Sequence, residues 1–125
     1  MKQRLMLLGV FLLCFALTTT ADDKKKEEKE VTIKGEVVDV ACYLAKGAKG
    51  EGHKGCAEGC AKAGGALGIL TADGKLYVSL LPDDHKAGPN DILMDHISHN
   101  VEAKGFVRSK SGVNGLMITS VAMAK

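Results

Sequence analysis

The sequence predicts a mostly-β protein, a small five-stranded barrel of the OB type, and three observations lead to this fold class. Five segments of residues 31–125 are rich in β-branched residues or alternate apolar with polar ones, as strands do. Asp73-Gly74 lies between the second and third segments, and Asp-Gly between two such runs is a strong hairpin signal. A helix-like stretch separates the third and fourth segments, and this order of elements is typical of an OB-type barrel. A small open β-sandwich is the alternative.

Residues 31–44 form the first predicted strand, and their apolar side chains change face part way along. One face carries Val31, Ile33 and Val37, and the other carries Val38, Val40, Cys42 and Leu44. Because strand side chains alternate between two faces, such a change requires a bulge or a sharp bend, and Gly35 lies close to it. A bent first strand can pair with two neighbours, as a small curled barrel requires.

The other four strands follow in chain order. They are predicted over residues 67–71, 76–81, 101–109 and 116–123. A turn over residues 112–115 joins the last two. A short helix is expected over residues 90–99, between the third and fourth strands, with Asn90 as its N-cap.

The first 21 residues have the layout of a secretory signal peptide. Lys2 and Arg4 precede an almost continuous apolar run over residues 5–17, and small residues lead up to Ala21. The run is shorter than the roughly 20 residues that a membrane helix needs, so no membrane span is expected after cleavage. Residues 22–30 then form a charged flexible linker, and residues 31–125 form the barrel domain. The mature protein is expected to be periplasmic or secreted.

The composition excludes several functions. Without residues 1–21 the chain has 15 basic and 15 acidic residues, so it lacks the basic footprint that nucleic-acid binding needs. Outside that segment the aromatic residues are only Tyr43, Tyr77 and Phe106, too few for a base-stacking platform. The sequence contains no nucleotide-binding glycine loop and no catalytic triad order. No enzyme activity is therefore expected.

The chemistry of the chain is concentrated in the insertion between the first two strands, residues 45–66. Residues 56–63 are rich in alanine and predict a short helix, in which Cys56 and Cys60 lie one turn apart on the same face. His53 precedes them, and Cys42 lies at the end of the first strand. We expect these four residues to converge.

Three thiols and an imidazole are soft to borderline donors, which suit Cu(I) or Zn(II) and not calcium or magnesium. Cys42, His53, Cys56 and Cys60 are therefore the candidate metal ligands, and copper or zinc is the expected metal. The spacing is not that of a zinc finger, and Ala61 stands where a haem attachment motif has histidine.

The same cysteines fit two further roles. Exported cysteines usually pair, so a disulfide from Cys42 to Cys56 or Cys60 is an alternative that leaves one thiol over. A thiol-disulfide enzyme is the weakest alternative, since the chain lacks the usual pair with two intervening residues. Among the remaining histidines, His96 and His99 could form a metal pair on a helix, but surface solvation is favoured for them, as it is for His85.

The segment has a recognisable pattern. Gly35-Glu-Val-Val-Asp39 and Cys42-Tyr43 are followed by His53-x2-Cys56-Ala57-x2-Cys60-Ala61, and Gly68-Ile69-Leu70 then leads into a hairpin. It resembles a group of small exported bacterial proteins of uncharacterised function that have a signal peptide and an OB-like domain. The resemblance covers most of residues 31–125 and implies a site on Cys42, His53, Cys56 and Cys60. It implies no substrate.

The sequence thus predicts an exported metal-binding protein for metal carriage, buffering or structural stabilisation. Its partners would be the metal ion and an envelope protein. The alternative is a periplasmic binding module without metal, in which a disulfide fastens the insertion to the barrel.

Overall fold

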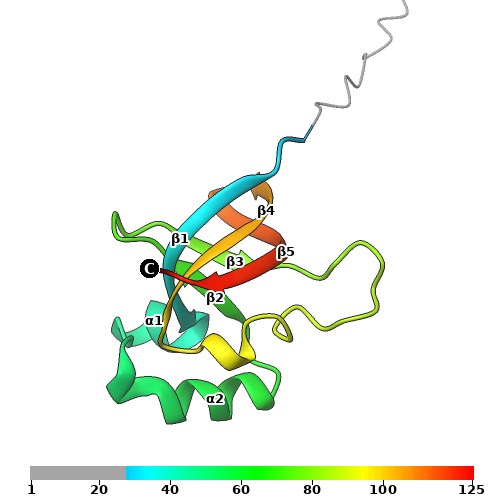
Figure 1. Ribbon diagram of the computed structural model, residues 1–125. Helices are drawn as coiled ribbons and strands as arrows, with labels where there is room; N and C mark the ends of the chain where they lie inside the picture. Colours follow the sequence, from blue (N-terminus) through cyan, green and yellow to red (C-terminus); the bar gives the residue numbers. More distant parts are fainter. Residues whose placement is uncertain (1–27) are drawn as a thin grey trace, which may run out of the picture.

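A computed structural model describes residues 28–125 as a closed barrel of five strands (Figure 1). The predicted signal peptide and residues 22–27 of the predicted linker lie outside the described residues. The strand order around the barrel is β1-β2-β3-β5-β4. The strands are β1 (Val31–Asp39), β2 (Leu67–Leu70), β3 (Leu76–Ser79), β4 (Asn100–Lys110) and β5 (Val113–Met123). The predicted OB-type barrel is confirmed.

The first strand pairs with two neighbours, as the sequence predicted. Its first part pairs antiparallel with β4 and its last part pairs antiparallel with β2, and Glu36 takes part in both pairings. Gly35 lies at the changeover, where a Cβ atom would collide with the backbone carbonyl of Leu70. The bend therefore needs a residue without a side chain.

The strand ends at Asp39 rather than at residue 44, and the next residues form a helix, α1 (Val40–Lys46). Three consecutive buried residues, Val37, Val38 and Asp39, close the strand. The change of apolar face that predicted a bulge thus marks the passage from strand to helix. The prediction that Cys42 lies at the end of the first strand was wrong for this reason.

Two hairpins carry the other strands. Gly74, with φ of 83°, lies in the β2–β3 hairpin that Asp73-Gly74 predicted. The β4–β5 hairpin turns at Ser111 and Gly112, whose φ values of 52° and 81° are those of a type I′ turn. This turn lies earlier than predicted, and Gly115 belongs to β5. Parallel pairing of β5 with β3 closes the barrel.

The short helix expected between the third and fourth strands is the single 3₁₀ turn η2 (Met94–His96), not the whole of residues 90–99. Asn90 does not cap a helix. Its side-chain amide donates to the Gly65 carbonyl over 2.7 Å, and its oxygen accepts from the Leu67 N–H over 2.9 Å. Asn90 therefore joins the long β3–β4 connection to the start of β2. Its side chain makes these two hydrogen bonds instead of capping a helix.

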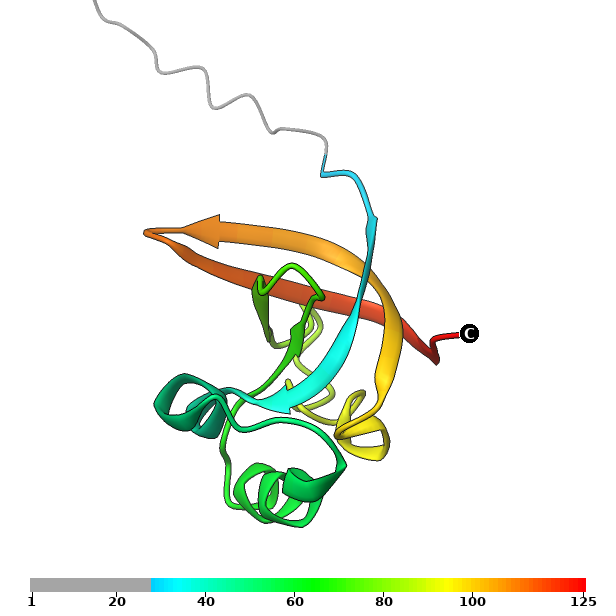
Figure 2. The same ribbon diagram turned by 90° about the vertical axis from the view of Figure 1, so that its left-hand side faces the viewer.

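A helical layer covers one end of the barrel (Figures 1 and 2). It consists of α1, the 3₁₀ turn η1 (Glu51–His53) and α2 (Lys54–Lys62). The α2 helix confirms the helix predicted in the insertion, and its Ala57 and Ala61 pack into the same core as the barrel residues. We call residues 39–66 the cap. Within residues 28–125, no helix is both long and apolar enough to cross a membrane.

Candidate metal centre

The α1 helix fixes the position of Cys42. The Asp39 side chain accepts a hydrogen bond from the Cys42 N–H over 3.1 Å and caps the helix. At the other end Gly47, with φ of 68°, donates to the Tyr43 carbonyl over 2.7 Å. The Asp39 side chain at the start of α1 and Gly47 at its end thus satisfy backbone groups that have no partner within the helix. Cys42 lies in its first turn, half-buried.

The η1 turn and α2 carry the remaining predicted ligands. His53 ends η1 and is the N-cap residue of α2, three residues before Cys56. Ala57 and Ala61 face the core, and the cysteine before each alanine is turned toward the edge of this buried face. Cys56 is exposed and Cys60 is half-buried.

The ligand atoms of the cap gather into two sets of three. Cys42, His53 and Cys56 form one set, which we call the outer set, and its ligand atoms all lie within 4.8 Å of one another. Asp39, Cys42 and Cys60 form the inner set under the same distance. Cys42 belongs to both. The structure thus brings Cys42 to each of the other three predicted ligands, but those four residues do not make a single set.

Asp39 is the site residue that sequence reasoning missed. It lies inside the apolar run Val-Val-Asp-Val, which suggested the interior of a strand. The available signal was its spacing, because an aspartate three residues before Cys42 is placed to cap a helix at the Cys42 N–H. Its side chain is only 1% exposed. Its Oδ2 atom meets no partner in standard hydrogen-bond geometry among the described residues.

The Asp39 carboxyl is ionised at neutral pH. Burial acts to raise its pKa, but hydrogen bonding from the Cys42 N–H and from the Cys60 thiol outweighs burial and holds the pKa below its ordinary value. Because Oδ2 has no hydrogen-bond partner among the described residues, its lone pairs are available to another partner.

The carboxylate acts on the thiols in the opposite direction. Hydrogen bonding to Asp39, followed by burial and the negative charge of Asp39, raises the pKa of the Cys60 thiol to about 12. Burial, followed by the charges of Asp39 and Cys56, raises the pKa of Cys42. Both thiols therefore keep their protons at neutral pH, and a cation that binds here must displace them.

The three cysteines of residues 28–125 are free thiols. The expected alternative, a disulfide from Cys42 to Cys56 or Cys60, is not formed. The Cys42 sulfur lies within 4.8 Å of the sulfurs of both Cys56 and Cys60 without a bond to either.

The other histidines lie outside both sets. His85 is exposed, as predicted. His96 and His99 are half-buried rather than solvated, and the Nδ1 atom of each is buried without a hydrogen-bond partner in the described part of the chain. Nε2 of His53, the histidine that lies beside the thiols, is also buried without a hydrogen-bond partner among the described residues.

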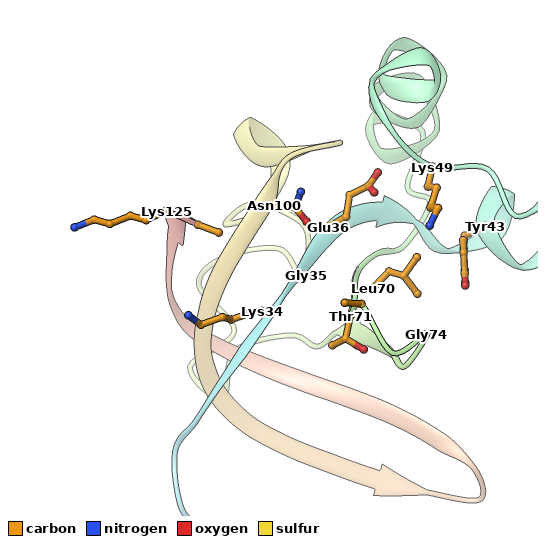
Figure 3. Close-up of a pocket in the computed structure, with 12 residues that line it drawn as sticks. Lys34, Gly35, Glu36, Tyr43, Lys49, Leu70, Thr71, Gly74, Asn100 and Lys125 are labelled. Atoms are coloured by element: carbon orange, nitrogen blue, oxygen red, sulfur yellow. The ribbon is translucent and has the colours of Figure 1, made fainter.

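A separate pocket of about 590 Å³ lies along the side of the barrel. Figure 3 shows Tyr43 and Lys49 on one side of it and Lys34 and Lys125 on the other. Glu36 also lines the pocket and accepts a hydrogen bond from the Gly50 N–H. No cysteine is among its described lining residues. The soft donors and this polar pocket are therefore two different sites that share the α1 helix.

Sulfur and imidazole donors this close together can hold a soft or borderline cation. The barrel and the gathered cysteine and histidine groups also agree with the pattern that the sequence resembles. Comparison of the chain with known protein families, with curated protein sequences and with solved structures finds no match.

Proposed function

We propose that the protein is an exported carrier or buffer of Cu(I) or Zn(II), which binds the ion on the cysteines and histidine of the cap. The observation that carries this proposal is the pair of donor sets around Cys42, each with ligand atoms within 4.8 Å of one another. Two of the three donors in each set are thiols, which select copper or zinc over calcium and magnesium.

Unpaired polar atoms support the proposal. Buried polar atoms usually have a hydrogen-bond partner, yet Oδ2 of Asp39 and Nε2 of His53 lack one within residues 28–125. Both atoms belong to residues of the donor sets. A bound cation would satisfy such atoms directly, whereas a role as mere barrel packing leaves them unexplained.

Exchange of the ion is favoured over a purely structural role. Structural zinc sites use four protein ligands, and sites with an open position keep three. Each set here has three donors, and Cys56 of the outer set is exposed. The core is formed by residues of the strands together with Leu93 and Ile97 of the β3–β4 connection, and it takes only Ala57 and Ala61 from the cap. The fold therefore does not depend on the metal, and the ion can leave.

The raised pKa values of Cys42 and Cys60 fit a carrier in an oxidising compartment. Thiolates rather than thiols react with oxidants and disulfides, so protonated thiols stay reduced longer until the metal arrives. The signal peptide expected for residues 1–21 supports export to the periplasm or the exterior. We propose an envelope protein as donor or acceptor of the ion, with no catalytic step on this chain.

The first experiment is elemental analysis of the mature protein, purified anaerobically from the periplasm, with a thiol count on the same sample. We expect copper or zinc to copurify and the three thiols to resist alkylation until a chelator is added. The double variant Cys56→Ser/Cys60→Ser should lose metal uptake. Unchanged metal content in that variant would overturn the proposal.

A matched pair of histidine variants provides the control. His53→Ala removes a donor of the outer set, and His85→Ala removes an exposed histidine of the β3–β4 connection. We expect weaker binding only in the first variant. Equal loss in both variants would indicate adventitious binding to surface histidines.

A further inference from the structure

The two donor sets meet at a single sulfur, Cys42 Sγ. Building on the metal-binding function proposed above, we propose that the loaded protein holds two zinc ions with the Cys42 thiolate as a bridge between them. His53 and Cys56 complete the outer position, and Asp39 and Cys60 complete the inner position.

A single ion does not account for all five donors. Zinc–sulfur bonds of about 2.3 Å place the ligand atoms of one tetrahedral ion about 3.8 Å apart. The donors of the cap instead divide into two sets, and only Cys42 is close enough to belong to both. Cys56 and Cys60 lie on successive turns of α2, so one faces each position while Cys42 lies between them.

The cap holds the bridging residue in place through the backbone. Asp39 binds the Cys42 N–H through Oδ1, which leaves Oδ2 for the inner ion. Gly47 and Ala48 donate to the carbonyls of Tyr43 and Cys42 at the other end of α1. These contacts use no sulfur atom, so Cys42 Sγ keeps its lone pairs for two metal ions.

The charges of the donors match two divalent ions. Three thiolates and the Asp39 carboxylate supply four negative charges, and His53 is a neutral ligand. Once all three thiols have released their protons to solvent, two zinc ions neutralise this set and leave no uncompensated charge beside the buried Asp39, which is 1% exposed. Uncompensated charge in such a place is costly.

The two positions differ in access. The outer set includes the exposed Cys56, whereas every member of the inner set is buried or half-buried. The outer ion is therefore expected to exchange faster with a chelator, and the inner ion to be retained longer. The shared sulfur allows an ion to pass from one position to the other without both of its thiolate bonds breaking.

The test is native mass spectrometry of protein titrated with Zn(II) under anaerobic conditions, at a fixed concentration of a competing chelator. Wild type should bind two zinc ions. Cys56→Ser and Cys60→Ser should each bind one, and Cys42→Ser should bind none. Circular dichroism checks that each variant is folded. We expect folding because the hydrogen bond from residue 42 to Asp39, which starts α1, uses the backbone N–H and not the sulfur.

Three further results would each contradict the proposal. One ion in wild type, with weaker binding in every single variant, would overturn the bridge and leave the carrier function standing. Two ions in Cys42→Ser would show independent positions and would also overturn the bridge. If wild type binds no zinc and no Cu(I), the proposed function itself fails. A scalar coupling between two ¹¹³Cd nuclei in cadmium-loaded protein would support the shared thiolate directly.

Discussion

The barrel and the cap differ in what they bury. The barrel buries apolar side chains such as Ile69 and Leu116 completely and pairs its strands in a closed ring. The cap buries only the two small alanines of α2 and Asp39, and it leaves Oδ2 of Asp39 and Nε2 of His53 unpaired among the described residues. The difference indicates that stability resides in the barrel and chemistry in the cap, and each of the following predictions tests that division.

The largest effect is expected from a cavity in the barrel. Ile69 is fully buried, so Ile69→Ala should lower the free energy of unfolding by about 2–5 kcal/mol. Leu44→Ala is the control in the cap, where Leu44 is 70% exposed, and its effect should stay within about 0.5 kcal/mol. Urea denaturation measures both. Equal losses would show that the cap contributes to the core more than its burial indicates.

The next effect concerns Asp39, the residue that joins the two regions. Asp39→Ala removes the acceptor for the Cys42 N–H and should cost about 1–2 kcal/mol. Asp39→Asn keeps an acceptor for that N–H and should cost less. Both variants should lose the inner metal position. Full zinc uptake by Asp39→Asn would show that the carboxylate acts only as a helix cap.

The same residue predicts a dependence of stability on acid. Its folded-state pKa lies below the ordinary value, so its contribution is complete above the unfolded-state pKa of about 3.9 and is lost as the pH falls through the lower folded value. Wild type should therefore lose stability on acidification more steeply than Asp39→Asn. Urea midpoints at a series of pH values between neutrality and pH 3 measure the two slopes.

A smaller effect of opposite sign is expected in α2. Gly59 is exposed in the helix, and a Cβ atom there would have no neighbour within 4 Å in the described structure. Gly59→Ala should therefore stabilise the protein by about 0.5–1 kcal/mol and leave zinc uptake unchanged. Gly65→Ala is the matched control, because its Cβ would lie 2.8 Å from the Cys60 carbonyl oxygen. Stabilisation by both changes would contradict this packing.

The last effect appears only in alkali. The folded-state pKa of Cys60 is raised from 9.0 to about 12, so the protonated thiol stabilises the fold fully below pH 9 and loses this contribution as the pH rises toward the folded value. In protein treated with a chelator, Cys60→Ser should therefore flatten the decline of the urea midpoint above pH 9. Parallel declines in variant and wild type would show that the thiol does not interact with Asp39.

The barrel could be predicted from the sequence because its signals are local. Alternating apolar residues, Asp73-Gly74 and the bend at Gly35 each act within a few residues. The α1 helix was missed because residues 40–44 continue the alternation of the strand before them. The only local mark of α1 is its N-cap residue, Asp39, and an aspartate inside an apolar run resembles a strand residue.

The donors could be predicted by type but not by grouping. His53, Cys56 and Cys60 are close along the chain, so the helix places them together. Their distances to Cys42 depend on the angle between α1 and α2, which no local pattern encodes. The division into two sets, and the membership of Asp39, follow from that tertiary arrangement.

The way α1 is held has a consequence for motion. None of the seven described residues of α1 is buried, and an isolated helix of that length does not persist in water. Between the two ends of α1, the Cys42 side chain contacts α2 through the donor sets. Amide hydrogens of α1 should therefore exchange within the fastest class of the domain in chelator-treated protein and slow markedly when zinc is added, while those of β1 stay unchanged. Binding would then be read out as the ordering of one helix, a signal that a partner protein can recognise.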